Sequence, residues 1–296
     1  MPTGTGLIAV DWGTTNRRAY AIGGGGEVTH RLRDGLGILS IKPGGFPAAV
    51  ADLRVRLGQL PILMAGMVGS NRGWVEVPYV DCPAGLGKLA RSLKHVPEFD
   101  AAIVPGLLHA DGGHADVMRG EEVQILGAVA ANLLPPDAAA CHPGTHAKWV
   151  KVKAGEITAF RTIMTGELFA LLKNHSLLAS QLQAEVTPGH AFAAGVQRSL
   201  DRCELTADLF QIRARGLTGR LSDEDAAPYA SGLLIGADIR AGLSFLDMDQ
   251  PVALIGSPRL TTLYAAALHQ AGRESREIDG QAAFLAGIRK LAEELR

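Results

Sequence analysis

The sequence predicts a two-lobed α/β protein, and three observations carry that prediction. Apolar residues make up 47% of the 296 residues, aromatic residues only 5%, and glycine occurs 36 times. Such a composition is typical of close helix–sheet packing. Short apolar strands alternate with longer segments of helical spacing, and this order occurs twice along the chain. Gly112-Gly113 predicts the break, with an N-terminal lobe at 1–112 and a C-terminal lobe at 113–296.

The net charge and the cysteine content limit the binding partners and the compartment that we expect for this protein. The formal net charge is −1, which provides no attraction for nucleic acid or an anionic membrane. No apolar run reaches the roughly 20 residues of a membrane helix, and no signal-peptide pattern opens the chain. Three widely spaced cysteines favour a reducing compartment. We expect a soluble cytoplasmic protein acting on small molecules; no interface signature is visible, and a homodimer stays open.

The N-terminal lobe is predicted to be rich in strands. Gly23 to Gly26 can form a hairpin loop, because glycine enters positive φ freely. No helix follows these glycines, as a phosphate-binding fingerprint would require. Alternating and helical apolar spacing define the other elements. The expected strands are 7–10, 18–22, 27–31, 61–64 and 101–104, the expected helix is 46–57, and a glycine- and aromatic-bearing loop covers 66–79.

The C-terminal lobe is predicted to be rich in helices. Pro135-Pro136 should end its first helix, because proline cannot continue one. A turn at Ala154-Gly155 should join two strands. The expected helices are 121–134, 168–182, 190–200, 205–213, 229–245, 260–271 and 281–295, and the expected strands are 147–153, 157–162 and 251–255.

An acidic residue and a Gly-Thr bend follow the first apolar strand. Asp11 ends this strand, and Gly13, Thr14 and Thr15 form the bend. Backbone N–H groups and hydroxyls at such a bend can bind a phosphate. Asp11 is then a candidate to hold the magnesium that accompanies a nucleoside triphosphate, directly or through water. The alternative is an Asx-turn, in which Asp11 only caps the bend. The residues of this segment leave both alternatives open.

A second Gly-Thr pair occurs in the segment "CHPGTHAKWV". Gly144 and Thr145 precede an apolar strand, with His146 and Lys148 nearby. Two such bends in two lobes predict a paired binding site for a polyphosphate. Zinc is not predicted at Cys141 and its neighbouring histidines, because a matching second pair of ligands is missing.

Two further segments carry candidate site residues. Glu121 and Glu122 follow Gly120 at the start of a helix, where the macrodipole favours acids. A carboxylate there can also accept the proton of a substrate hydroxyl in phosphoryl transfer. Gly256-Ser257 stands between a strand and a helix and predicts a small-residue notch for a flat base.

Two motifs are weaker signals. "GLGKL" at 85–89 fails the phosphate-loop pattern, because Cys82 replaces the earlier glycine and Leu89 replaces Ser or Thr. "HADGGHAD" at 109–116 has the residue types of a divalent-metal cluster. Its two central glycines favour a solvated loop between the lobes instead.

Taken in order, these segments resemble the 2-dehydro-3-deoxygalactonokinase family, which belongs to the sugar kinases of the actin, Hsp70 and hexokinase superfamily. The resemblance rests on "VDWGTTNRRAY", "MAGMVGSNRGWVEVPYVDCPAG", "MRGEEVQILGA", "HPGTHAKWV", "FRTIMTGELFALL" and "LIGSPRLTTLYAAAL". It implies two ribonuclease-H-like (actin-like ATPase) lobes with a cleft between them. The N-terminal lobe is then expected to bind the sugar and one phosphate motif, and the C-terminal lobe the nucleotide.

The resemblance also implies a reaction, cofactors and residue roles. ATP with Mg²⁺ is expected to phosphorylate the 6-hydroxyl of 2-dehydro-3-deoxy-D-galactonate, in galactonate catabolism. Glu121 matches the general base, a position that the superfamily usually fills with Asp, and Glu122 is the alternative. Asp11 is expected near the magnesium. The residues expected to bind ATP are Asp11, Gly13, Thr14, Thr15, Gly144, Thr145, His146, Lys148, Gly256 and Ser257.

The sugar acid is expected to contact the residues after the first bend and the 66–79 loop. Its carboxylate needs a cation or several neutral donors. The candidates are Asn16, Arg17, Gly66, Met67, Ser70, Asn71, Arg72, Trp74 and Tyr79. Alternatives stay open: Asn16 and Arg17 can brace the bend, Trp74 and Tyr79 can be core packing, and Arg72 can be a surface residue.

Three other functions stay open at this point. The same fold can phosphorylate another 2-keto-3-deoxy sugar acid, such as the gluconate epimer. A metal-dependent hydrolase would use the 109–116 cluster, and a sensor would bind ATP without turnover.

Overall fold

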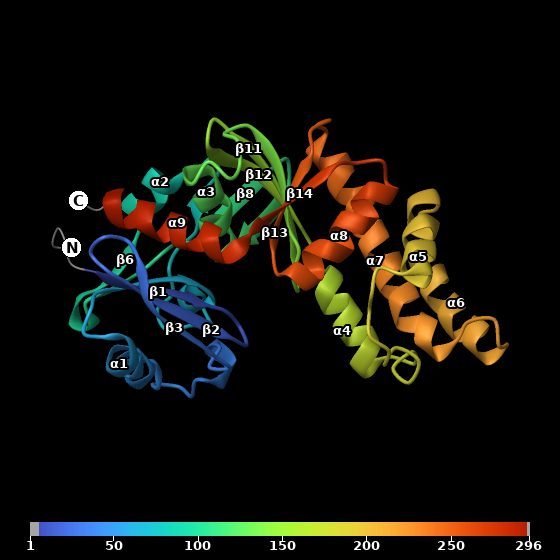
Figure 1. Cartoon of the computed structure of the whole chain (residues 1–296), viewed down its shortest axis with the longest axis horizontal. Coiled ribbons are helices and arrows are strands. Elements are labelled where there is room, and N and C mark those ends of the chain that lie inside the picture. Colours follow the sequence, from blue (N-terminus) through green and yellow to red (C-terminus); the bar gives the residue numbers. More distant parts are fainter. Residues whose placement is uncertain (1–5, 295–296) are drawn as a thin grey trace. The chain divides into compact units, whose positions relative to one another are not determined.

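In the computed structural model, which describes residues 6–294, the chain forms two compact units. Of the described residues, unit 1 comprises 6–137, 152–159 and 280–294, and unit 2 comprises 138–151 and 160–279. These units differ from the contiguous lobes predicted at 1–112 and 113–296, because residues 113–137 and the C-terminal helix group with the N-terminal segment. Figure 1 follows the chain through both units.

Unit 1 is built on a six-stranded sheet of order β3-β2-β1-β4-β7-β6. A separate three-stranded sheet has the order β5-β8-β9. The strands are β1 (Leu7–Trp12), β2 (Arg17–Ile22), β3 (Val28–Asp34), β4 (Ile62–Gly66), β5 (Val80–Asp81), β6 (Lys94–Val96), β7 (Ala101–Ile103), β8 (Leu107–Asp111) and β9 (His114–Met118). The helices are η1 (Ile38–Ser40), α1 (Phe46–Leu57), η2 (Met67–Gly69), α2 (Leu86–Arg91), η3 (Pro97–Phe99), α3 (Glu121–Ala130) and α9 (Gly280–Glu294).

The six-stranded sheet is covered by helices on both faces (Figure 1). Successive strand residues point to opposite faces, and the buried side chains of β1 divide in this way. Ile8, Val10 and Trp12 pack with α1 in one core cluster. On the other face, Tyr20 of β2 contacts Phe284 of α9, with ring centroids 6.2 Å apart. Asp11 lies in β1 between Val10 and Trp12, so it belongs to the face that α9 covers.

Unit 2 is built on a five-stranded sheet of order β12-β11-β10-β13-β14. Helices α7 and α5 pack closely against each other beside it (Figure 1). The strands are β10 (Ala138–His142), β11 (Ala147–Lys153), β12 (Glu156–Ile163), β13 (Val252–Gly256) and β14 (Ser275–Asp279). Residues 152–159, which form the end of β11 and the first half of β12, group with unit 1. The helices are α4 (Thr165–His175), α5 (His190–Asp201), α6 (Leu205–Leu217), α7 (Asp223–Leu246) and α8 (Pro258–Gln270).

The two main sheets share one strand order. In each sheet the first strand in chain order lies in the middle, with the second and third strands on one side of it and the fourth on the other. The unit 2 order β12-β11-β10-β13-β14 thus corresponds to β3-β2-β1-β4-β7 in unit 1, where β6 adds one more strand at the edge. In both sheets the first strand pairs in parallel with the fourth, as β1 with β4 and β10 with β13. The sequence contains no repeat that would predict this shared strand order. The same topology requires a similar apolar periodicity but not the same residues.

Several element boundaries differ from the predicted ones for local reasons. Helix α3 ends at Ala130, before the two prolines, because Asn132 takes a left-handed conformation with φ 55°. Helix α4 ends at His175, where Ser176 accepts a hydrogen bond from the N–H of Leu178. Helix α7 begins six residues before the predicted start, because the Ser222 hydroxyl caps it through the N–H of Asp225.

The 109–116 segment was predicted as a loop between lobes, and that prediction is wrong. Residues 107–118 form the β8–β9 hairpin inside unit 1, with His109 opposite Asp116 and Asp111 opposite His114. Gly112 and Gly113 both have positive φ and form its tight turn. Within residues 6–294 no group of three or more His, Cys, Asp or Glu side chains is arranged to hold a metal ion.

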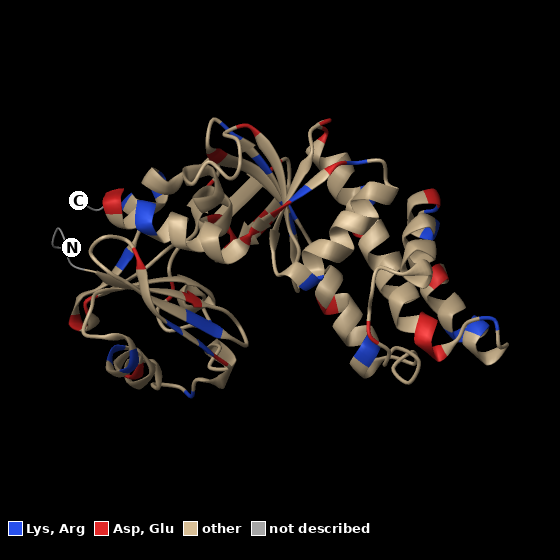
Figure 2. Ribbon diagram, in the orientation of Figure 1, with Lys and Arg blue, Asp and Glu red and all other residues tan. Residues whose placement is uncertain are grey.

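Charge and hydropathy on the surface agree with the composition. Lysines and arginines alternate with acidic residues along the outer elements of both units (Figure 2). No helix in the described part of the chain combines the length and apolar character needed to cross a membrane.

Candidate active site

The first Gly-Thr bend connects β1 to β2, as predicted. The N–H of Gly13 donates to the carbonyl of Asn16 at 2.9 Å and closes the turn. Thr14, Thr15 and Asn16 are exposed at its tip, and the Asn16 amide donates to the Thr15 hydroxyl at 3.0 Å. The bend therefore presents two hydroxyls and an amide side chain on the surface of unit 1.

Asp11 lies immediately before this bend and is partly exposed. Its carboxylate is 20% exposed and lies 3.4 Å from the guanidinium of Arg18, which is opposite it in β2. The Asx-turn alternative is wrong, because the N–H of Gly13 donates to Asn16 and not to Asp11. Burial raises the pKa of Asp11, the charge of Arg18 opposes this shift, and the Glu121 carboxylate raises the pKa further. The end of β1 therefore carries a largely buried carboxylate paired with Arg18.

Glu121 and Glu122 begin α3 but occupy different environments. Glu121 is partly exposed, and its carboxylate accepts a hydrogen bond from the N–H of Arg119 at 3.1 Å. Glu122 is fully buried and accepts from the N–H of Gly120 at 2.6 Å. The second carboxylate oxygen of Glu122 has no hydrogen-bond partner among the described residues. Both carboxylates thus accept hydrogen bonds from backbone N–H groups just before α3. Of the two, only Glu121 is accessible to solvent.

Burial raises the pKa of Glu122 to about 8, and the neighbouring Glu121 carboxylate adds to this shift. Backbone N–H donors and the charge of Arg119 only partly oppose it. Glu122 is therefore protonated at neutral pH, and a protonated carboxyl cannot accept a further proton as a base. Of the two acids, Glu121 has the environment that a general base requires.

Replacing Glu122 by glutamine should change how stability depends on pH. The folded protein keeps a proton that the unfolded chain releases above its ordinary pKa of 4.5. The contribution of Glu122 to the free energy of unfolding therefore falls as pH rises from about 4.5 to about 8. Glutamine does not titrate, so the stability of the variant relative to wild type should rise by up to about 1.4 kcal/mol per pH unit in this window.

Urea unfolding at pH 5, 6.5 and 8 measures this difference directly. A constant offset between the two proteins across the series would mean that Glu122 is ionised in the fold.

The 66–79 loop joins β4 to β5 and is held against the residues just described. Gly66 has φ 94°, and a Cβ there would come within 2.8 Å of the Trp12 carbonyl. A Cβ at Gly120 would lie 3.1 Å from the Gly66 Cα. The starts of this loop and of α3 therefore touch backbone to backbone, which only glycines allow. Met67 opens the short helix η2 directly after Gly66.

The predicted sugar residues of this loop divide into exposed and buried ones. Asn71 and Arg72 are exposed. Ser70 is buried, and its hydroxyl donates to Met67 and accepts from the N–H of Arg72. Trp74 packs in the core against Phe46 and Phe99, with ring centroids 6.4 and 5.1 Å away. For Trp74 the structure therefore supports the core-packing alternative.

Arg119 was not among the residues singled out from the sequence. It is 8% exposed, and its guanidinium donates to the Val77 carbonyl at 2.7 Å and lies 4.3 Å from the centre of the Tyr79 ring. Two of its nitrogens, Nε and Nη1, have no partner among the described residues. Its place directly before Gly-Glu-Glu in "MRGEE" was the available signal. Arg119 therefore contacts the 66–79 loop at Val77 and Tyr79, and Tyr79 is exposed.

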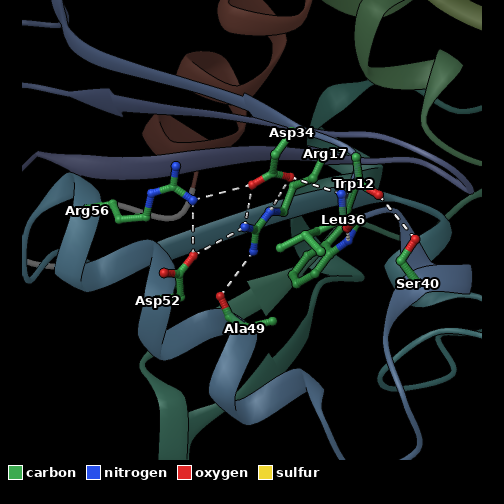
Figure 3. Close-up of polar contacts among 9 residues, drawn as sticks. Trp12, Arg17, Asp34, Leu36, Ser40, Ala49, Asp52 and Arg56 are labelled. Atoms are coloured by element: carbon green, nitrogen blue, oxygen red, sulfur yellow. Dashed lines mark hydrogen bonds and ion pairs between the residues drawn. The ribbon is translucent and has the colours of Figure 1, made fainter.

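Arg17 is buried beneath the first bend (Figure 3). Its guanidinium forms an ion pair with Asp34 at 2.8 Å, donates to the Ala49 carbonyl at 3.1 Å and lies 5.2 Å from the Trp12 ring centre. Asp52 lies 3.4 Å away. Such a fully bonded side chain has no donor directed at a ligand. Of the two alternatives left open for Arg17, the structure supports bracing of the bend.

The second Gly-Thr bend connects β10 to β11 in unit 2. Thr145 and His146 are exposed, and His146 contacts the Glu167 carboxylate of α4. The N–H of Glu167 donates to the Thr145 carbonyl at 2.9 Å. A Cβ at Gly166 would collide with the Gly144 carbonyl, so the start of α4 packs directly on this bend. Lys148 is buried in β11, and its ammonium donates to Thr162 at 2.7 Å.

The predicted adenosine notch lies beside this bend. Gly256 ends β13, and a Cβ there would lie 3.5 Å from the Pro143 carbonyl. Ser257 follows as the exposed N-cap of α8. The structure therefore places Gly256 against Pro143, the residue before Gly144-Thr145, as the sequence order alone could not show.

A buried carboxylate holds the start of α4 in place. Asp238 of α7 accepts hydrogen bonds from the Trp149 indole N–H and from the hydroxyls of Thr165 and Tyr264. Burial raises the pKa of Asp238 to about 6, although the three hydrogen bonds oppose that shift. Thr165 is the first residue of α4, so this cluster supports the helix that contacts the second bend.

Two sheets with the same strand order, each carrying a Gly-Thr bend between its first two strands, define the two-lobed ribonuclease-H-like fold of actin-like ATPases and sugar kinases. Component A of the (R)-2-hydroxyglutaryl-CoA dehydratase of Acidaminococcus fermentans shares this fold. The TM-score is 0.57 at 12% sequence identity, over 99% of this chain and 100% of that chain. The predicted fold class is thereby confirmed.

The chain belongs to the 2-keto-3-deoxy-galactonokinase family, whose model matches residues 11–291. The 2-dehydro-3-deoxygalactonokinase of Escherichia coli K12 is 38% identical over 288 residues, which cover 96% of this chain and 97% of the relative. A crystal structure from Sinorhizobium meliloti, described as a candidate 2-dehydro-3-deoxygalactonokinase, superposes with a TM-score of 0.91 at 36% identity. That match covers 97% of this chain and 98% of the other.

Proposed function

We propose that this protein is an ATP-dependent kinase that phosphorylates the 6-hydroxyl of 2-dehydro-3-deoxy-D-galactonate. The observation that carries the proposal is the backbone contact that brings the start of α3, and with it Glu121, against the end of β1, where Asp11 precedes the exposed Gly-Thr bend. Phosphoryl transfer needs an acid near the metal, a second acid at the substrate hydroxyl, and donors for the phosphate oxygens. Membership of the kinase family supports the same reaction and substrate.

In this proposal Glu121 accepts the proton of the 6-hydroxyl as its oxygen attacks the γ-phosphorus. The Glu121 side chain is partly exposed, and one of its oxygens bonds the Arg119 N–H, which fixes the orientation of the carboxylate. Gly13, Thr14 and Thr15 are assigned to phosphate oxygens of ATP, as are Gly144, Thr145 and His146. Gly256 and Ser257 are assigned to the adenosine. Lys148 is assigned a supporting role, because its ammonium is bonded inside the sheet.

Asp11 is assigned to magnesium. Its pKa is raised partly by the charge of Glu121, and a divalent cation relieves repulsion of this kind between two carboxylates. Carboxylate oxygen is the ligand type that Mg²⁺ prefers, so the residues fit the ion. Bound magnesium supplies positive charge to the phosphate oxygens of ATP. Asp11 is held for this role by β1 and by its ion pair with Arg18.

The sugar acid is assigned to the first bend and to the 66–79 loop. Asn16, Asn71 and Arg72 are exposed donors on these two segments, and Ser70 and Tyr79 border them. Arg72 is the candidate for the substrate carboxylate, because Arg17 is committed to Asp34. Gly66 and Met67 place the loop beside α3, and Trp74 anchors it in the core.

We assign the protein to the cytoplasm, because the proposed reaction uses ATP. A homodimer stays a prediction. The gluconate-derived epimer is the alternative substrate, because one hydroxyl separates the two sugar acids. The metal-dependent hydrolase is not retained, since the 109–116 residues form a hairpin.

A coupled ADP-release assay over a panel of 2-keto-3-deoxy sugar acids tests the function. We expect the galactonate-derived acid to stimulate ADP release most strongly, with kcat/KM at least tenfold above that for the gluconate epimer. A specificity reversed between the two epimers would reassign the substrate and keep the kinase. If no acid on the panel stimulates ADP release, the proposed reaction is wrong.

A further inference from the structure

A short segment after β3 forms backbone hydrogen bonds with the first Gly-Thr bend. We call residues 36–39 the support segment. Its N–H groups donate to all three carbonyls of the bend: Gly37 to Thr15 at 3.3 Å, Ile38 to Gly13 at 3.0 Å and Leu39 to Thr14 at 3.2 Å. Each carbonyl of the bend is thereby held toward the support segment.

This pairing determines where the N–H groups of the bend point. In a planar trans peptide, the carbonyl of one residue and the N–H of the next point in opposite directions. With the carbonyls of Gly13, Thr14 and Thr15 held by the support segment, the following N–H groups point to the other side of the bend. Successive N–H groups that point the same way form an anion-binding concavity. The support segment thus arranges the bend as a phosphate receptor.

Gly37 sets the distance between the support segment and the bend. A Cβ at this position would lie closer than 3.0 Å to the carbonyl carbon of Thr15 and to the carbonyl oxygen of Thr14. The backbone angles of Gly37, φ −64° and ψ 168°, are accessible to any residue. Space therefore requires glycine here, and backbone conformation does not.

The support segment is itself held by the buried Arg17 cluster (Figure 3). Asp34 accepts two hydrogen bonds from Arg17, at 2.8 and 3.3 Å, and a third from the N–H of Leu36 at 3.2 Å. The Leu36 carbonyl accepts from the Trp12 indole at 2.8 Å. Burial would raise the pKa of Asp34, but these donors and the charge of Arg17 hold it below its ordinary value. Asp34 is thus an ionised link between Arg17 and the support segment.

We infer that Gly37 is a positioning residue for nucleoside triphosphate binding: it lets the support segment approach closely enough to aim the N–H groups of the first bend at phosphate. The inference rests on the proposed kinase function. It adds to that function a residue that lies outside both Gly-Thr bends and outside the acid pair. Asp34 is also a positioning residue, because it holds the support segment by accepting a hydrogen bond from the N–H of Leu36.

The matched pair of variants Gly37→Ala and Gly35→Ala tests the inference. A Cβ at Gly35 meets no atom within 4 Å, so the two variants add the same methyl group two residues apart. Gly37→Ala should raise the KM for MgATP at least tenfold and weaken MgADP binding in calorimetry by a similar factor. Its KM for the sugar acid should rise less than its KM for MgATP, because only Asn16 of the first bend is assigned to that substrate. Gly35→Ala should match wild type in all three measurements.

Equal changes in both KM values would show general disruption of unit 1 and would overturn the positioning role. A folded Gly37→Ala with wild-type affinity for MgADP would also overturn it, while the kinase assignment would stand. If Gly37→Ala does not fold, Asp34→Asn decides: we expect a smaller rise in the KM for MgATP alone, and no rise rejects the inference. If the wild-type protein binds no nucleotide, the proposed function fails, and the inference fails with it.

Discussion

Replacing Glu121 by glutamine should lower kcat by a factor of about 10² to 10⁴ while leaving the affinity for MgATP within about twofold. General-base assistance contributes about that much to proton transfer. Glutamine has nearly the shape of glutamate, and its amide oxygen can still accept the hydrogen bond from the Arg119 N–H. It cannot accept the substrate proton. Steady-state kinetics and calorimetric titration with MgADP on the same preparation measure both quantities.

Glu122, the acid next to Glu121, provides the control variant for this experiment. Glu122→Gln is matched in chemistry and differs by one position, but Glu122 is buried and already protonated at neutral pH. Its kcat should therefore fall far less than that of Glu121→Gln. A loss confined to Glu122→Gln would transfer the general-base role to Glu122. Turnover of Glu121→Gln at the wild-type rate would remove Glu121 from that role.

Replacing Asp238 by alanine should cost unit 2 about 3 to 5 kcal/mol, and the melting temperature should fall by roughly 10 °C. The change leaves three buried donors without their acceptor: the Trp149 indole and the hydroxyls of Thr165 and Tyr264. An unsatisfied buried donor costs about 1 to 3 kcal/mol. Asp238 itself is almost completely buried, so water cannot replace it without a cavity.

Asp238→Asn is the control for this prediction. Asparagine keeps one acceptor oxygen and the side-chain volume, and the two hydroxyls can rotate to accept from its amide. Its melting temperature, followed by circular dichroism at pH 7, should lie between those of wild type and Asp238→Ala. A melting temperature of Asp238→Ala within 2 °C of wild type would show that the cluster does not stabilise α4 or the second bend.

Much of the candidate site could be predicted from the sequence, because its signals are local. The strand–turn–strand reading of Gly13-Thr14 is confirmed, and so is the strand predicted after Gly144-Thr145, whereas β10 before that second bend was not predicted. A change of periodicity and a glycine at a bend depend only on neighbouring residues. The place of Glu121 at a helix start is local in the same sense.

Other features were decided by contacts between residues far apart in the chain. Arg17 follows the bend in sequence, yet Asp34 and Ala49 turn it into a buried support. Nothing near position 37 in the sequence shows that it faces the Thr15 carbonyl. The composition of 109–116 is that of a loop, but pairing of His109 with Asp116 makes it a hairpin.

By itself, the sequence determined the α/β class, the two Gly-Thr bends and the acid at the start of α3. Each of these depends on the order and spacing of nearby residues, which backbone geometry converts directly into structure. Only the tertiary structure decided which arginine is buried and committed to an ion pair, which of the two glutamates keeps solvent access, and what holds the first bend. These properties depend on burial and on long-range partners, because the same arginine or glutamate behaves differently once water is replaced by protein.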